Sequence, residues 1–475
     1  MKEENPMNSN IVRIENVEIE NYKNVKYGNI CLENARKKYK ASILGLYGQN
    51  GSGKTALIDA ISLLKDLLMG QPVPSKFADC INVDAEKATF SFLFKIICNN
   101  DNKQDEYKVK YKFSIRKDID ESVPNLQQNT KFKVTIFNEM LSASIKNHDL
   151  KTKFASLIDT NSNAVFKPVS KYKEIIGSSK NIETNLLVSK KIAEKTSRSF
   201  IFSKELLITI KENCSQNHYL NIYNALVNYG NFDLFIIDTT NSGLISINAG
   251  LPFAFTYEEK GHKAVGTIML QLNGVSIIPK QALEVVKKVI SSMNFVLKEM
   301  VPGLIIDVKE LGTQIQENGI ETCSIQLLSL KNNKVIPLQY ESEGIKKIIS
   351  ILNLLINVYN KPSITVAIDE LDAGIFEYLL GELLRIIAEK GKGQLIFTSH
   401  NLRPLETLDR GFIAFTTTNP ENRYIRFTNV KTNNNLRDFY YRDILLGEQN
   451  EPVYEPTSNS DIALAFKEAG VSLGA

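Results

Sequence analysis

Apolar and polar residues follow two different periods in the first part of the chain. Residues 11–32 alternate in two blocks around a short polar segment, which predicts a hairpin of two strands. The segment 41–48 (ASILGLYG) is an unbroken apolar run, as expected for a strand buried on both faces of a sheet. The residues after it carry apolar side chains at helical spacing and stop at Gly70, which predicts a helix over 55–70.

The middle of the chain changes character. Runs rich in aromatic and β-branched residues predict an antiparallel meander at 88–97, 106–115 and 131–140. From about 150 to 300, lysine, asparagine and serine dominate, and 279–300 gives the clearest helical pattern. No heptad is sustained over several repeats, so the sequence excludes a long coiled coil.

Strands and helices alternate again in the last third of the chain. The pattern predicts strands at 303–311 and 322–330, a helix at 342–360, a buried strand at 363–370, a helix at 375–391 and a buried strand at 394–400. Apolar strands at both ends of the chain favour an α/β fold, with one doubly wound sheet interrupted by an insertion. We therefore expect four parts: the N-terminal part of a nucleotide-binding head (1–145), a mainly helical insertion (146–300), the C-terminal part of the head (301–420) and a polar C-terminal tail (421–475).

Composition narrows the class of protein. The chain has 475 residues, 43% hydrophobic residues and a formal net charge of +4, which is typical of a globular protein with a sizeable core. No apolar run is long enough to span a membrane, and the polar start MKEENPMNSN does not resemble a secretory signal. The five cysteines are scattered, which excludes a sequence-evident zinc ribbon or disulfide framework. We expect a cytoplasmic protein without a membrane partner.

The segment 48–55 (GQNGSGKT) lies between the predicted strand and helix and matches the phosphate-loop pattern G-x-x-x-x-G-K-[ST]. Glycines let backbone N–H groups point inward, and the helix N-terminus adds its positive end. Lys54 is expected to reach the β- and γ-phosphates of ATP, and the Thr55 hydroxyl to coordinate Mg²⁺. The expected nucleotide-binding residues of this loop are Gly48, Asn50, Gly51, Ser52, Gly53, Lys54, Thr55 and Ala56.

Two carboxylates and a histidine follow the later buried strands. Asp369 and Glu370 end the run VAIDE, and His400 ends IFTSH, at the edge of a parallel sheet where ligands bind. Asp369 is expected to hold Mg²⁺, and Glu370 to orient and deprotonate the attacking water. His400 is expected to hydrogen-bond the γ-phosphate. Lys54, Glu370 and His400 are thus the candidate catalytic residues.

Ser342 and Gly344 open the helix predicted at 342–360, and two interpretations apply to them. They can cap the helix within the chain. They can also present the positive helix N-terminus to a γ-phosphate. Since the phosphate loop already holds that phosphate from one side, a second helix end is most easily supplied by another subunit, so that ATP would join a homodimer or higher homo-oligomer.

The order of phosphate loop, Ser-x-Gly helix, VAIDE, LDAG and TSH resembles the head domain of ABC-type ATPases, and most closely the branch that includes SMC, RecF and OLD proteins. The resemblance implies a P-loop NTPase fold of the ABC-type head, with an antiparallel β subdomain beside the helical insertion. It places Lys23 and Asn24, in VEIENYKNV, near the nucleotide, and makes His400 the switch histidine. Asp372 is similar to the aspartate that couples the two sites of the dimer. Glu343 and Ile345 depart from the transporter signature, and Gln71 is the only candidate for the Q-loop glutamine.

Among compact relatives, the chain most resembles the AAA family ATPases of bacterial defence islands, such as those of the Septu and PARIS systems. This implies an ATP-switched assembly that gates a separate effector protein, a nuclease or a toxin, in anti-phage defence. The alternative is a RecF- or SMC-like ATPase of DNA maintenance that binds DNA. A nuclease on this chain is disfavoured, because the Asp307-x-Lys309 fragment has no well-placed acidic partner.

Overall fold

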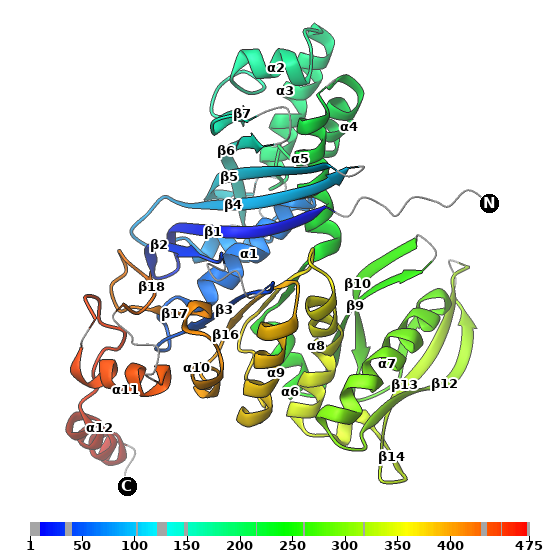
Figure 1. The fold of residues 1–475 in the computed structure, drawn as a ribbon, viewed down its shortest axis with the longest axis vertical. Helices are drawn as coiled ribbons and strands as arrows, with labels where there is room; N and C mark the ends of the chain where they lie inside the picture. Colours follow the sequence, from blue (N-terminus) through cyan, green and yellow to red (C-terminus); the bar gives the residue numbers. More distant parts are fainter. Residues whose placement is uncertain are drawn as a thin grey trace.

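The computed structural model describes residues 10–33, 40–100, 103–120, 131–146, 151–214, 216–259, 262–316, 319–428, 435–447 and 449–472 (Figure 1). Within these residues, no helix combines the length and the apolar character needed to cross a lipid bilayer.

A central, mostly parallel sheet organises the molecule. Its strands lie in the order β18 (Tyr424–Ile425), β17 (Ile413–Thr416), β3 (Ser42–Tyr47), β16 (Gln394–Thr398), β15 (Thr365–Ile368) and β8 (Leu234–Ile237). Only β18 pairs antiparallel to its neighbour. Every residue of β3, β15, β16 and β17 is buried, which explains their unbroken apolar runs. The predicted α/β fold, with one sheet made from both ends of the chain, is confirmed.

Helices cover both faces of this sheet. Alternate residues of one strand belong to different cores: Leu44 and Leu46 pack on the side of α1 (Lys54–Leu68), and Ile43 packs on the side of α8 (Glu343–Asn360) and α9 (Glu377–Lys390). The short α10 (Arg403–Thr407) lies beside α9. Because strands run toward one edge and helices return from it, the N-termini of α1, α8 and α9 all lie at the carboxyl edge of the sheet.

An antiparallel sheet packs on the far side of α1, as Figure 1 shows. Its order is β2 (Val25–Cys31), β1 (Ile11–Tyr22), β4 (Lys87–Asn100), β5 (Lys103–Ile119), β6 (Phe132–Lys146) and β7 (Ala155–Asp159). The predicted hairpin and the predicted meander are therefore parts of one sheet. Stacked rings of Phe90, Phe92 and Phe113 hold neighbouring strands together on its buried face.

The stretch 146–300 contains more than the helices expected of it. Its helices are α2 (Val169–Ile175), α3 (Lys180–Lys195), α4 (Lys204–Asn213), α5 (Asn217–Asn228), α6 (Thr239–Ser246) and α7 (Lys280–Met300). It also contributes β7, β8, the hairpin of β9 (Gly250–Glu259) and β10 (His262–Gln271), and β11 (Ser276–Pro279). Since β8 is an apolar run that pairs with β15, this stretch also builds part of the head itself.

The remaining elements complete the C-terminal half. The strands β12 (Ile305–Ile315), β13 (Glu321–Lys331) and β14 (Lys334–Pro337) form a small antiparallel sheet with β11, on which α7 packs. The tail after residue 417, which has only weak sequence patterning, contains β18, α11 (Leu436–Leu446) and α12 (Asn459–Ser472). Single turns of other helix types are η1 (Ser75–Cys80), η2 (Tyr229–Asp233), η3 (Leu338–Tyr340) and η4 (Arg410–Phe412).

Candidate functional site

A cavity of about 380 Å³ lies where the phosphate loop, the β1–β2 turn and the carboxyl ends of β15 and β16 meet. Its lining residues are Lys23, Asn24, Asn50, Gly51, Gly53, Lys54, Thr55, Ala56, Asp369, Glu370, Thr398 and His400. All of these residues except Thr398 were predicted from the sequence as site residues. They come from positions as distant in the chain as Lys23 and His400. Gly48 and Ser52 belong to the same loop but do not line the cavity, and neither do Ser342 and Gly344.

The loop between β3 and α1 requires its glycines. Gly53 is the N-cap of α1 and has a φ of 94°, in the left-handed region that side chains with a Cβ rarely adopt. A Cβ on Gly48 would lie 1.8 Å from Thr416 Oγ1, so β17 packs directly against the loop. The hydroxyls of Ser52 and Thr416 are hydrogen-bonded at this contact. The central sheet thus holds the loop in the shape that a phosphate needs.

Lys54 fixes a positive charge in this cavity. Its Nζ donates to the carbonyl oxygens of Gly48 at 2.8 Å and Gln49 at 2.9 Å, and the residue is 7% exposed. Burial lowers the pKa of Lys54, while the carboxylates after β15, Asp369 first among them, act to raise it. The ammonium group is therefore held at the loop close to carboxylates that can share a metal ion with a triphosphate.

Asp369 is buried and incompletely paired. It is 1% exposed, and its Oδ1 accepts a hydrogen bond from Thr398 Oγ1. Its Oδ2 is buried with no hydrogen-bond partner among the described residues. A buried carboxylate oxygen without a partner is costly unless something binds it. With the Thr55 hydroxyl in the same cavity, the oxygen donors fit Mg²⁺.

Glu370 follows directly and turns the chain. Its φ of 49° lies in the left-handed region, where a non-glycine residue costs about 1–3 kcal/mol and often marks a functional position. Its backbone N–H donates to Thr398 Oγ1 at 2.8 Å, so one threonine holds both carboxylate residues in place. This turn brings Glu370 to the cavity beside Asp369.

The loop after β16 is tied to the loop after β15. Asp372 Oδ2 accepts hydrogen bonds from the backbone N–H groups of His400 at 3.1 Å and Asn401 at 3.0 Å. Although His400 is exposed by surface area, partial desolvation lowers the pKa of its imidazole, and the Lys54 ammonium lowers it further. The carboxylates of Asp372, Glu370 and Asp369 act in the opposite direction, and the lowered pKa favours the neutral imidazole, which carries one N–H donor.

The N-terminus of α8 is positioned by a close backbone contact. Ser342 is its N-cap and accepts a hydrogen bond from the Ile345 N–H at 3.3 Å, in agreement with the capping interpretation. A Cβ on Gly344 would lie 2.1 Å from the carbonyl oxygen of Gly374, so only glycine fits against the turn after β15. Ser342 is exposed. The positive end of α8 is thus exposed at Ser342, and neither Ser342 nor Gly344 lines the cavity of its own chain.

Two charged residues near the site, the buried Lys347 and the half-buried Asp238, have no counterpart in the sequence reasoning. Lys347, on α8, is 2% exposed, and burial lowers its pKa, while the carboxylates of Glu370, Asp369, Asp372 and Asp238 act to raise it. Asp238 directly follows β8 at the same sheet edge. Its signal was present in the sequence, because LFIID at 234–238 repeats the pattern of an apolar strand ending in an aspartate.

Residues of the C-terminal tail form hydrogen bonds with the phosphate loop and the β1–β2 turn. Tyr424 Oη donates to the Gly53 carbonyl oxygen at 2.9 Å. Arg423 donates to the carbonyl oxygens of Thr417 at 2.6 Å and of Asn24. The Glu455 N–H donates to the Gln49 side chain at 3.0 Å. The boundary expected at residue 420 therefore does not end the parts that build the site.

Gln71 does not take part in the site. It lies beyond the C-terminal end of α1, where its N–H donates to the Asp66 carbonyl oxygen. A helix of this length separates it from Lys54 by roughly 20 Å, and Gln71 does not line the cavity.

The sequence profile of the family described as AAA ATPase domain matches residues 13–403, which is most of the chain. The chain belongs to this AAA ATPase family. This AAA ATPase is similar in fold to several solved structures at low identity. One is the Smc head bound to the C-terminal winged-helix domain of ScpA (12% identity, 88% of this chain and 98% of that chain, TM-score 0.39). Another is the SMC head domain from Thermotoga maritima (12% identity, 88% of this chain and 99% of that chain, TM-score 0.35). A third is the recombination mediator RecF with a bound ATP analogue (13% identity, 88% of this chain and 99% of that chain, TM-score 0.33). Comparison with curated protein sequences gives no match.

Proposed function

We propose that this AAA ATPase binds ATP with Mg²⁺, hydrolyses it to ADP and phosphate, and uses the cycle to join and release two copies of itself. The observation that carries the proposal is the buried Asp369 Oδ2, which has no partner among the described residues and lies in one cavity with Lys54, Thr55 and Glu370. An acidic oxygen left unpaired beside a phosphate loop is explained by a metal–nucleotide complex.

Each residue has a role that follows from its position. The backbone of 48–55 and the N-terminus of α1 bind the phosphates, and Lys54 exchanges its loop carbonyls for β- and γ-phosphate oxygens. Asp369 and Thr55 hold Mg²⁺, which supplies charge neutralisation at the phosphates when bound. Glu370 orients a water molecule and accepts its proton, and His400 donates a hydrogen bond to the γ-phosphate. Lys23 and Asn24 flank the nucleotide from the β1–β2 turn.

The second part of the proposal concerns α8. Its N-terminus carries a positive partial charge, is exposed at Ser342 and does not line the cavity of its own chain. In the proposed dimer, Ser342 and the Gly344 amide of one protomer bind the γ-phosphate held by the other. Hydrolysis removes that phosphate and releases the contact.

A comparison of three proteins tests the enzymatic role. The wild type is expected to hydrolyse ATP only with Mg²⁺. Lys54→Ala is expected to lose nucleotide binding, and Glu370→Gln to retain binding while losing turnover and accumulating dimers in ATP. Normal turnover by Glu370→Gln would refute its assignment as the base.

Two cellular roles remain predictions. The first is control of a separate effector protein, a nuclease or toxin, in anti-phage defence. It predicts co-purification with the product of a neighbouring gene, and toxicity only when both proteins are expressed. The second is DNA maintenance in the manner of RecF or SMC. It predicts ATP-dependent DNA binding that weakens steeply with salt through counterion release.

A further inference from the structure

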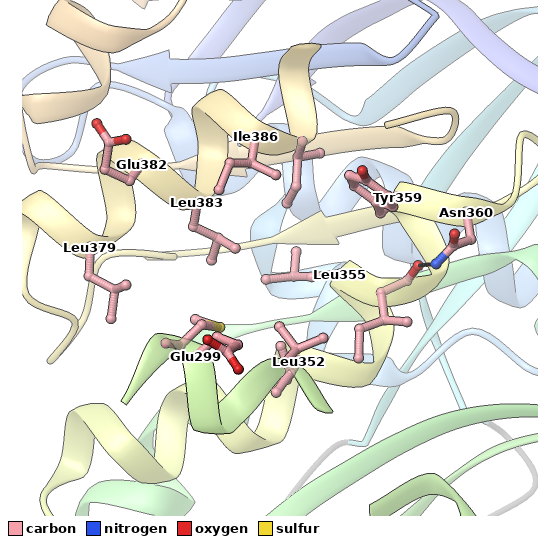
Figure 2. A pocket seen from close by; sticks show the side chains of 13 residues that line it. Glu299, Leu352, Leu355, Tyr359, Asn360, Leu379, Glu382, Leu383 and Ile386 are labelled. Atoms are coloured by element: carbon pink, nitrogen blue, oxygen red, sulfur yellow. Dashed lines mark hydrogen bonds between the residues drawn. The ribbon is translucent and has the colours of Figure 1, made fainter. Parts of the chain in front are cut away.

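An apolar groove lies between α7, α8 and α9, away from the nucleotide cavity (Figure 2). It has a volume of about 480 Å³. Leu379, Leu383 and Ile386 form a stripe along α9, and Leu352 and Leu355 of α8 face them. Ile386 is 47% exposed.

The stripe on α9 continues past the groove toward the nucleotide edge. Phe376, the N-cap of α9, lies one turn before Leu379 and is 71% exposed. Only Ile375 separates Phe376 from Gly374, which packs against Gly344. One end of the apolar surface therefore adjoins the exposed N-terminus of α8. Neighbouring exposed apolar side chains of this kind mark a candidate binding surface.

The C-terminal helix α12 presents a matching surface. Every residue from 459 to 469 is exposed, including Ile462 at 44%, Leu464 at 56% and Phe466 at 78%. Ile462 and Phe466 are four residues apart, so they lie on one face of the helix. A helix of fourteen residues with its apolar side chains in water gains most of its stability by docking in a groove.

The point of attachment of α12 indicates which groove it can reach. The Glu455 N–H donates to Gln49 of the phosphate loop, and Val453 is 1% exposed, so the chain is anchored just before α12. The linker 456–458 bridges at most about 14 Å when extended. Figure 1 shows α12 at the lower left, below α11, with α10 and then α9 farther to the right. The rise of α12 adds about 10 Å between residues 459 and 466, so Phe466 lies within about 25 Å of this anchor at the phosphate loop.

The proposed dimer brings the groove of a second copy near this anchor. In the ATP-joined dimer proposed above, on which this inference rests, the phosphate loop of one protomer faces the α8 N-terminus of its partner. The anchor of α12 then lies beside the Phe376 end of the partner's groove. The geometry points to α12 as an arm that docks, reciprocally, in the groove between α7, α8 and α9 of the other protomer.

Sedimentation velocity in ATP and Mg²⁺ tests this, with Glu370→Gln as the parent to hold the dimer together. Phe466→Asp removes the arm's aromatic anchor, and Ile386→Asp places a charge in the groove. Each is expected to raise the dimer dissociation constant about 100- to 10,000-fold, because the homodimer loses one buried large apolar side chain at each of its two reciprocal contacts. Val83→Asp, a matched control at a position 98% exposed and outside both surfaces, is expected to change it less than twofold.

Mixing the two variants separates docking between chains from docking within one. A heterodimer of Phe466→Asp and Ile386→Asp keeps one intact pair, the arm of the second on the groove of the first. It is expected to form more tightly than either homodimer. If the mixture dimerises no more tightly than the homodimers, the exchange of arms is refuted. An unchanged dimer dissociation constant for Phe466→Asp refutes it as well. If the parent itself forms no dimer in ATP, the proposed function fails, and the docking fails with it.

Discussion

The contact between Gly344 and Gly374 gives a sharp test of how α8 is positioned. In Gly344→Ala, the new Cβ would start 2.1 Å from the Gly374 carbonyl oxygen, whereas ordinary contact begins at 3.4 Å. The backbone must therefore open by about 1.3 Å (3.4 − 2.1), because neither neighbour has a side chain that can move aside. Overpacking of this kind costs about 1–3 kcal/mol. A displacement of this size at a catalytic group lowers turnover by about 100-fold.

Two assays read the change separately. Thermal unfolding is expected to shift down by a few degrees. The turnover of ATP is expected to fall about 100-fold, while nucleotide affinity of the monomer stays within a few-fold, since Gly344 does not line the cavity. Gly243→Ala in α6 is the matched control, because no atom of the described residues lies within 4 Å of its new Cβ. A Gly344→Ala protein with wild-type stability and turnover would refute the positioning of α8 by this contact.

The remaining predictions concern groups in and behind the cavity. Lys54→Ala should weaken ATP binding at least about 100-fold by calorimetry without a change in circular dichroism, since it removes a charge that binds two phosphates; binding within tenfold of wild type would contradict its role. Tyr424→Phe removes the hydrogen bond to Gly53, and a net value of about 0.5–1.5 kcal/mol predicts a 2- to 12-fold rise in KM for ATP with little change in kcat; an equal KM would show that the tail does not support the loop. For His400, a lowered pKa means that the unfolded chain binds the proton first, so its contribution to stability is lost as pH falls from about 6.5 through the lower pKa of the folded state. Melting curves of His400→Gln should lack this acid-side loss, and identical pH profiles for the two proteins would contradict it.

The phosphate loop and the acidic pair could be predicted because their signals are local. The run 41–48, the glycines after it and the helix that follows are contiguous, and the physics of phosphate binding fixes their order. The run 365–370 shows both its burial and its terminal carboxylates in six residues. The role of such segments can be predicted from contiguous sequence, without knowledge of any long-range contact.

The place of β8 and the role of the tail could not be predicted in the same way. The order of strands in a sheet is set by pairing between distant segments, and the four residues of β8 follow a helical region with no sign that they join β15. Tyr424 and Gly53 are 371 positions apart, and Arg423 and Asn24 are 399 apart, so neither contact leaves a periodic pattern. The polar composition after residue 417 therefore suggests that the head ends there, whereas residues beyond this point contact the nucleotide site.

The most direct test of the account is a structure of Glu370→Gln with ATP and Mg²⁺ bound. We expect two copies around two nucleotides, with Ser342 and the Gly344 amide of each protomer within hydrogen-bonding distance of the γ-phosphate held by the other. A bound nucleotide whose γ-phosphate faces solvent, with both α8 N-termini distant from it, would contradict the proposed ATP-joined dimer.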